Sequence, residues 1–193
     1  MPKRVDPGER RRLIADALMR VASSRGLEAV SLRHVAEEAG ATAGMVQHYF
    51  RTKDEMMLFA LDVVSERAEA RIGAAVAALG PTPAPRALLR TMLLEILPLD
   101  DARRADGRVA LAFLAYSAVR PEVAAAQRRG AIGLRDFVAT LLPGNGASAL
   151  MALVEGLGLH LLSDVLTPDE AVAALDAQLA RLFSASAVNS SAG

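Results

Sequence analysis

Residues 40 to 53 combine a helix stop, a short helix and the start of another helix. Gly40 suits the left-handed conformation that ends a helix, and the Thr42 hydroxyl suits the N-cap of the next one. Val46 and Phe50 lie four residues apart, so one helix face is available for burial. The other faces carry small or hydrogen-bonding side chains, Ala43, Gly44, Gln47 and His48. Such a face suits a helix that enters a groove, and the pattern predicts the second half of a helix-turn-helix.

A lysine follows in an unusual place. Thr52, Lys53, Asp54 and Glu55 form a capping box, which opens a further helix with a cation in its first turn. A cation at this end opposes the helix dipole, and a nearby anion such as a phosphate would remove the conflict. Only Lys3 and Lys53 are lysines among the 22 basic residues.

The elements that would position this segment are all helical, since helix caps and helical apolar spacing recur and strand patterns do not. The sequence predicts an all-α fold of nine helices. The predicted boundaries are Asp6 to about Gly26, Ser31 to Gly40, a short helix after Thr42, Thr52 to Leu79, and then 85–97, 101–118, 121–142, 147–165 and 168–183. We expect a three-helix helix-turn-helix domain over 1–52, a helical domain over 53–184 and a flexible tail over 185–193.

Charge is distributed unevenly along the 193 residues. The formal net charge is zero, but residues 1–53 hold ten Lys or Arg against six Asp or Glu, a net of +4, and the remainder holds twelve against sixteen, a net of −4. A basic N-terminal region is typical of a protein that binds nucleic acid with one end. Chance is the alternative for so modest an excess.

Several classes of protein lack support in the sequence. There is no cysteine, which excludes disulfides and thiolate metal sites. The longest uncharged run, 137–154, contains Pro143 and Gly144 and is not a membrane span, and the N-terminus has no apolar run typical of a signal peptide. We therefore expect a cytoplasmic protein with no membrane association. The sequence has no phosphate-binding glycine loop, no nucleophile elbow and no pair of histidines at metal-binding spacing, so we expect no cofactor, no metal and no enzymatic activity.

Residues 6–57 resemble the N-terminal domain of the TetR family of bacterial transcriptional regulators. The resemblance rests on Thr42, Gly44, the run His48-Tyr49-Phe50, and Lys53. The C-terminal half is most similar to the BetI-like branch, in residues 110–116 and 153–160 and in the capped last helix. The resemblance implies nine helices, a DNA-binding N-terminal domain, and a C-terminal domain for ligand binding and dimerisation.

The expected DNA contacts fall into two groups. Gln47 is expected to read a base edge, with a solvated residue as the alternative; many family members carry Tyr there, so a phosphate contact often made by that Tyr does not transfer. Ala43 and Gly44 allow close approach, and Met45 either touches a thymine methyl or packs internally. The expected phosphate contacts are Ser31, Arg33, Thr42, His48, Tyr49 and Lys53. Alternatives are a capping role for Ser31, a base contact or a structural role for His48, and core packing for Tyr49.

The C-terminal half is expected to bind an unknown small-molecule effector. The candidate pocket residues are Met92, Phe113, Tyr116 and His160, with ordinary core packing as the alternative. His160 with Glu155 and Asp164 is also a conceivable metal site, although a packed histidine is the simpler reading. Choline recognition calls for an aromatic cage, and a chain with no Trp and five Phe and two Tyr gives choline little support.

A homodimer is expected because two helices carry broad apolar stripes. The candidate interface residues are Leu150, Leu153, Val154, Leu157, Leu161, Val172, Leu175, Leu179 and Leu182. Together with the resemblance, these features favour a repressor that binds a palindromic duplex operator as a dimer and is released by an effector. The alternatives are an enzyme, which no motif supports, and a helical protein-interaction module without DNA contact.

Overall fold

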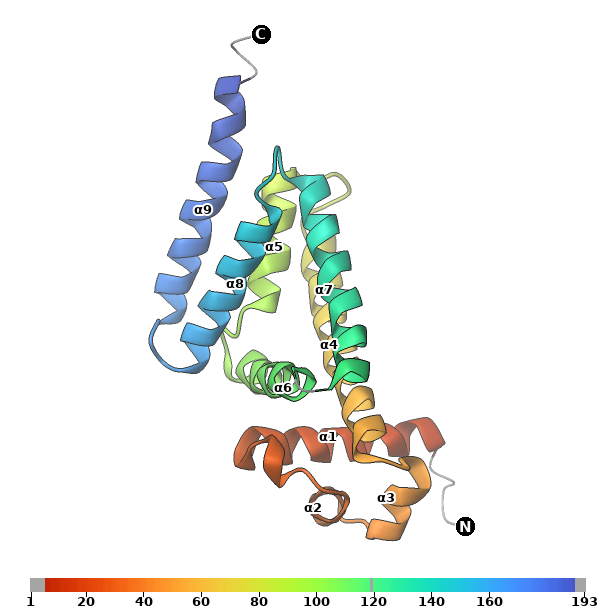
Figure 1. Ribbon diagram of the computed structural model, residues 1–193. Helices are drawn as coiled ribbons and strands as arrows, with labels where there is room; N and C mark the ends of the chain where they lie inside the picture. Colours follow the sequence, from red (N-terminus) through yellow and green to blue (C-terminus); the bar gives the residue numbers. More distant parts are fainter. Residues whose placement is uncertain (1–5, 119, 190–193) are drawn as a thin grey trace. The chain divides into compact units, whose positions relative to one another are not determined.

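The computed structural model describes residues 6–118 and 120–189 (Figure 1). Within these residues there are nine α-helices, one short 3-10 helix (Leu27–Ala29) and no strand, which confirms the predicted fold class. The helices are α1 (Pro7–Arg25), α2 (Leu32–Glu38), α3 (Ala43–Tyr49), α4 (Lys53–Ala77), α5 (Pro85–Ile96), α6 (Asp101–Ser117), α7 (Pro121–Leu141), α8 (Ala147–Leu162) and α9 (Pro168–Asn189).

Local capping explains where several helices begin. The Asp6 carboxylate accepts a hydrogen bond from the Gly8 amide at 3.3 Å, with Pro7 at the first helical position of α1. At α9, the Thr167 hydroxyl accepts from the Glu170 amide at 3.3 Å and the Glu170 carboxylate accepts from the Thr167 amide at 2.8 Å. This reciprocal pair is a capping box, as the sequence predicts.

The last helix is longer than the sequence suggests. We expected it to end at 183 and a tail to begin at 185, whereas α9 continues to Asn189. Alanine, at 185 and 187, has the highest helix propensity, which outweighs the lower propensity of Ser184 and Ser186. Residues 190–193 of the expected tail lie outside the described part of the chain.

The chain divides into two compact units. One comprises Met1–Arg67 with Arg108–Ala125, and the other comprises Ala68–Gly107 with Ala126–Gly193. The expected domain boundary at residue 52 does not coincide with this division. The reason is that Met56, Met57 and Val63 of α4, and Phe113 of α6, are buried in the same hydrophobic cluster as α1.

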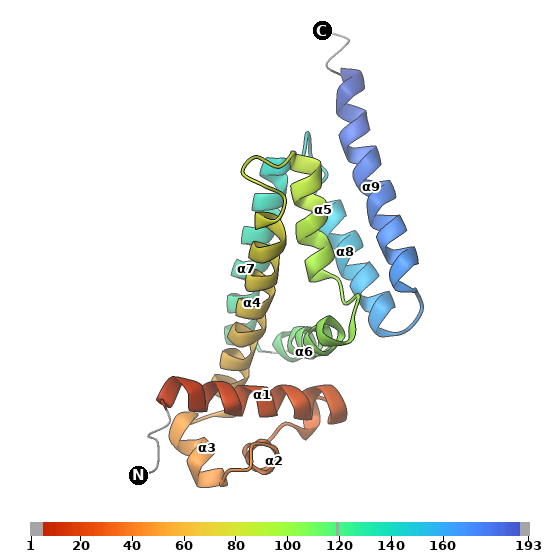
Figure 2. The ribbon, with the colours of Figure 1, turned by 180° about the vertical axis from the view of Figure 1, so that it is seen from behind.

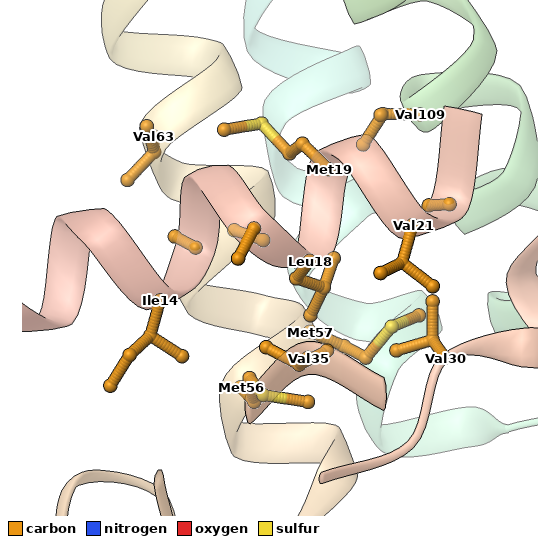
Figure 3. Packing of buried hydrophobic residues seen from close by; sticks show 14 of the residues in the cluster. Ile14, Leu18, Met19, Val21, Val30, Val35, Met56, Met57, Val63 and Val109 are labelled. Atoms are coloured by element: carbon orange, nitrogen blue, oxygen red, sulfur yellow. The ribbon is translucent and has the colours of Figure 1, made fainter. Parts of the chain in front are cut away.

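The core of the first unit gathers apolar side chains from α1, α2, α3, α4 and α6. Figure 3 shows Ile14 and Leu18 of α1 beside Val35 of α2 and Met56 and Met57 of α4. Each of these five side chains is at most 1% exposed. Because α2 and α3 have only seven residues each, their conformation depends on this packing rather than on intrinsic helix stability.

The second unit buries its own cluster between α5, α7, α8 and α9. Leu93 of α5, Val138 of α7, Leu150 of α8 and Leu175 of α9 are each at most 1% exposed. The helices α5, α8 and α9 lie side by side in both views of the ribbon (Figures 1 and 2). None of the helices among the described residues is long and apolar enough to cross a bilayer.

An ion pair joins α5 to α9. Arg90 donates to both carboxylate oxygens of Asp176, at 2.5 and 2.9 Å. The hydrogen bond from Arg90 lowers the pKa of Asp176 below its ordinary value. The carboxylate therefore stabilises the fold above the unfolded pKa of about 3.9, and this contribution is lost as the pH falls through the lower folded value.

We expect Asp176→Asn to lower the free energy of unfolding at neutral pH by at most about 1 kcal/mol, since both side chains are partly exposed to solvent. Urea unfolding at a series of pH values measures the difference from wild type, which should shrink as the pH falls through the folded pKa of Asp176. Asp136→Asn is the control, because Asp136 pairs with its sequence neighbour Arg135 and joins no second helix through that pair. A difference that grows on acidification contradicts the assignment.

Candidate nucleic-acid interface

The turn between α2 and α3 is fixed by backbone conformation and a side-chain cap. Gly40 has φ +61°, a left-handed conformation that favours glycine. Its amide donates to the Glu37 carbonyl at 3.2 Å, and the next amide, of Ala41, donates to Ala36 at 2.9 Å. The Thr42 hydroxyl then accepts from the Met45 amide at 3.2 Å. The chain therefore ends α2 and starts α3 with four residues between them.

The inner and outer faces of α3 differ sharply. Val46 and Phe50 are fully buried in the first unit's core, as their spacing predicts. Tyr49 is half-buried, with its ring edge-on to His48 at 5.2 Å between centroids. The exposed residues of the helix are Ala43, Gly44, Met45, Gln47 and His48. The structure thus brings most of the expected base-reading residues onto one open surface.

Gly44 is not required by the internal packing of the chain. A Cβ atom built at this position would meet no atom within 4 Å, and the residue does not have a positive φ. A side chain here would instead occupy the space above the exposed face of α3. Without a side chain at this position, a binding partner can approach the backbone of α3 closely.

Arg11 of α1 secures the end of α3 and the start of α4. Its guanidinium carbon lies 4.8 Å from the centroid of the Phe50 ring and 4.6 Å from that of Phe59, and Nη2 lies 3.4 Å from Glu55. Cations over aromatic faces are attracted by the ring quadrupole. Glu55 also accepts the Arg51 amide at 2.9 Å, so one carboxylate connects α1 to the loop after α3. No local sequence pattern indicates this role of Arg11, since its partners are far away in the chain.

Lys53 stands at the first position of α4, as the capping pattern predicts. The Thr52 hydroxyl accepts from the Glu55 amide at 3.0 Å. Partial burial, and then the positive charge of Arg120, lower the pKa of Lys53. An anion near the ammonium would oppose both effects, because it favours the charged form.

Two further candidates lie at the start of α2. The Ser31 hydroxyl accepts from the His34 amide at 3.2 Å, so Ser31 does cap the helix. Arg33 is exposed and pairs with Glu37 one turn later at 3.1 Å. The Arg33 side chain is 82% exposed, which leaves this pair screened by solvent.

The four expected pocket residues do not fall in one compact unit. Phe113 and Tyr116 belong to the first unit, where both are buried in its core, whereas Met92 and His160 belong to the second. Phe113 and Tyr116 therefore pack in the core, which was the alternative to a role in a pocket. His160 is exposed, and among the described residues no group of three His, Asp or Glu side chains could hold a metal ion.

Most of the expected dimer residues are buried within the chain itself. Six of them are at most 5% exposed: Leu150, Val154, Leu157, Leu161, Leu175 and Leu179. They form the second unit's own core, so they are corrected from interface to core residues. Leu153, Val172 and Leu182 are half-buried. An apolar stripe shows that a face is covered, but not whether the covering helix belongs to the same chain.

Comparison with known proteins gives matches to both halves of the chain. The family model for bacterial regulatory proteins of the tetR family matches residues 14–59, and that for the C-terminal part of BetI-type transcriptional repressors matches 85–184. The chain is 36% identical over 176 residues to the HTH-type transcriptional regulator PksA of Bacillus subtilis, covering 85% of this chain and 84% of PksA.

Two further matches concern a repressor and a solved structure. The chain is 41% identical over 75 residues to the HTH-type transcriptional repressor KstR of Mycolicibacterium smegmatis, covering 39% of this chain and 36% of KstR. The crystal structure of a transcriptional regulator from Rhodococcus sp. Rha1 superposes with a TM-score of 0.81 at 33% identity, covering 91% of this chain and 96% of that one.

The cap at Thr42 gives a direct test of how α3 is held. We expect Thr42→Ala to lower the free energy of unfolding by about 1 kcal/mol, because one amide of α3 loses its acceptor. Thr42→Ser is the matched variant and should stay close to wild type, since serine also caps. Urea unfolding measures both, and equal losses in the two variants would show that the hydroxyl cap is not the cause.

Proposed function

Because this chain belongs to the TetR family of bacterial transcriptional regulators, we propose that it is a repressor that binds duplex DNA through the exposed face of α3. One observation carries the proposal: Val46 of the seven-residue helix α3 and Phe50, its C-cap, are fully buried, while Ala43, Gly44 and Gln47 of the same helix are exposed. A short helix with small residues at its N-terminal end suits entry into a major groove.

In this proposal Gln47 reads the sequence. Its amide presents a donor and an acceptor, which match the N7 and N6 groups of adenine in the major groove. Met45 is 37% exposed at the same end of α3 and is available to contact a thymine methyl group. Ala43 and Gly44 have no side chain larger than a methyl group, so the backbone of α3 can approach the DNA closely.

The phosphate contacts surround this face. Thr42 and Tyr49 lie at the two ends of α3, and Lys53 lies at the start of α4. Ser31 and Arg33 at the start of α2, together with His48, complete the proposed set. Such contacts fix the register of the protein on the duplex without reading its sequence.

We assign DNA binding to residues 1–52, and dimerisation and effector binding to residues 53–184. For the dimer, the outer faces of α8 and α9 replace the buried residues as candidates. Leu159 is 49% exposed, Ala152 and Gly156 are on the same helix, and Ala173 and Ala177 are exposed on α9. Small residues let helices of two subunits approach closely, and a two-fold contact would present two α3 helices to a palindromic operator.

Release by a small molecule completes the proposed function. An effector shifts the equilibrium only if it binds the form that does not bind DNA more tightly than the form that does. Met92 and His160, which both belong to the second unit, remain candidate effector-binding residues. The cellular compartment proposed is the cytoplasm, where a DNA operator is accessible.

Selection from a pool of random duplexes tests the central proposal. We expect recovery of a palindromic sequence whose binding constant falls steeply as salt rises, because several phosphates are neutralised. Lys53→Ala should weaken binding about tenfold or more. It should also reduce the slope of log K against log salt by about one for each subunit bound. Arg135→Ala is the control, since it removes one exposed positive charge from α7. An equal effect of both substitutions contradicts a phosphate contact at Lys53.

A second substitution tests base reading. Gln47→Ala should relax preference at one base pair of each half-site, with a loss of roughly 1 to 3 kcal/mol of discrimination. Repeating the selection with this variant measures the preference position by position. Unchanged specificity at every position would show that Gln47 reads no base.

A further inference from the structure

The C-terminal end of α2 is held by an arginine of α1. Nε of Arg20 donates to the Glu38 carboxylate at 2.6 Å, and Nη2 donates to the Glu38 carbonyl at 3.4 Å. Glu38 is the last residue of α2, and both residues belong to the first compact unit. One guanidinium therefore contacts both the side chain and the backbone of the residue at which α2 ends.

The contact with the carbonyl completes the hydrogen bonding of this helix end. The last four carbonyls of an α-helix have no amide partner within the helix. In α2, the backbone amides that follow the helix donate to three of these carbonyls, those of Val35, Ala36 and Glu37. The fourth carbonyl, that of Glu38, accepts from Arg20. The turn and Arg20 together satisfy the whole helix end.

The contact with the carboxylate offsets an unfavourable charge. A negative charge at the C-terminal end of a helix opposes the helix dipole, and a cation beside it removes the conflict. The side chains of Arg20 and Glu38 are 56% and 35% exposed, so the ion pair contributes little to the free energy of unfolding. The pair is therefore better suited to positioning the end of α2 than to stabilising the fold.

The end of α2 is close in the chain to the start of α3. Four residues separate Glu38 from Ala43, the first residue of α3. The left-handed conformation of Gly40 and the cap at Thr42 fix the path of the chain between the two helices. A shift of the end of α2 therefore moves the start of α3.

The far end of α3 is also held by α1. The guanidinium carbon of Arg11 lies 4.8 Å from the centroid of the ring of Phe50, which is the C-cap of α3. Side chains of α1 thus contact the chain just before and just after α3. Burial of Val46 sets the rotation of α3 about its axis, whereas one fixed point at each end sets the direction of that axis.

We propose that Arg20 is a positioning residue for DNA binding, which holds the end of α2 against α1 and so sets the angle at which α3 enters the major groove. This inference rests on the proposed function. It adds a residue that acts through Glu38 rather than through a contact of its own with DNA.

The test compares Arg20→Gln with wild type in binding to the duplex recovered by selection and to an unrelated duplex of the same length. We expect the dissociation constant for the selected duplex to rise about tenfold, the effect of losing one base contact. Affinity for the unrelated duplex should change no more than it does in Arg12→Gln. Arg12→Gln is the matched control, because it removes the same charge from α1 and its partner Glu66 lies on α4.

A second variant, Glu38→Ala, separates positioning from a direct contact of Arg20 with a phosphate. It removes a negative charge from the DNA-binding unit, so charge alone predicts tighter binding. Positioning through Glu38 predicts the opposite, a rise of about three- to tenfold in the dissociation constant for the selected duplex. Glu37→Ala is its control, since Glu37 pairs with Arg33 within α2 and its loss should leave the affinity equal to wild type or higher. Binding by Glu38→Ala at or above the wild-type affinity would overturn the inference.

The double variant and the melting temperatures exclude a merely structural role. The double variant should bind no more weakly than Arg20→Gln, because both substitutions remove the same contact, and additive losses would overturn the inference. Since the pair is partly exposed, we expect melting temperatures to fall by at most about 4 °C. Affinity for both duplexes that is lost in proportion to the melting temperature would also overturn it. If Arg20→Gln does not fold, the sign of the change in Glu38→Ala decides.

The proposed function and this inference fail in different ways. Wild-type protein that binds no duplex would overturn both. Wild-type protein that binds DNA and is weakened by Lys53→Ala, but whose Arg20→Gln variant binds like Arg12→Gln, would overturn the inference alone.

Discussion

Burial of Val46 and Phe50 is the constraint on which the rest of the site depends. A seven-residue helix such as α3 has little stability of its own. Its rotation about its axis is therefore set by which side chains enter the core. Successive residues of a helix are about 100° apart, so a shift of one position would bury Gln47 and expose Val46. With Val46 and Phe50 fully buried, the small and hydrogen-bonding residues necessarily face outward.

The polar contacts around this core determine the positions of α1 and α4 more than they contribute to the free energy of unfolding. Arg11 stacks on Phe50 and pairs with Glu55, which connects α1 to the start of α4. Farther along α4, Arg67 pairs with Asp16 at 2.5 Å. These pairs are partly exposed, so each contributes little free energy. Their shared effect is to fix α4 against α1, and with it the place of Lys53 relative to α3.

The accuracy of the sequence-based predictions depended on how local each feature is. The caps at Asp6, Ser31 and Thr42 were predicted correctly, because donor and acceptor are two or three residues apart. The end of α9 was predicted too early. The alanines there favour a helix, whereas the small and polar composition favoured a tail. Six of the nine residues predicted for the dimer interface lie in the core of the second unit, because an amphipathic stripe does not reveal which chain covers it. The bond between Tyr116 and Asp54, 62 residues apart, left no local signal.

Chemical interference mapping of the selected duplex tests most directly whether the outer face of α3 enters the major groove. Dimethyl sulfate methylates guanine N7 in the major groove and adenine N3 in the minor groove, so one reagent reports on both. The account predicts that binding is lost on methylation of guanine N7 in two segments about one helical turn apart, with adenine N3 having little effect. Interference confined to adenine N3 would contradict it.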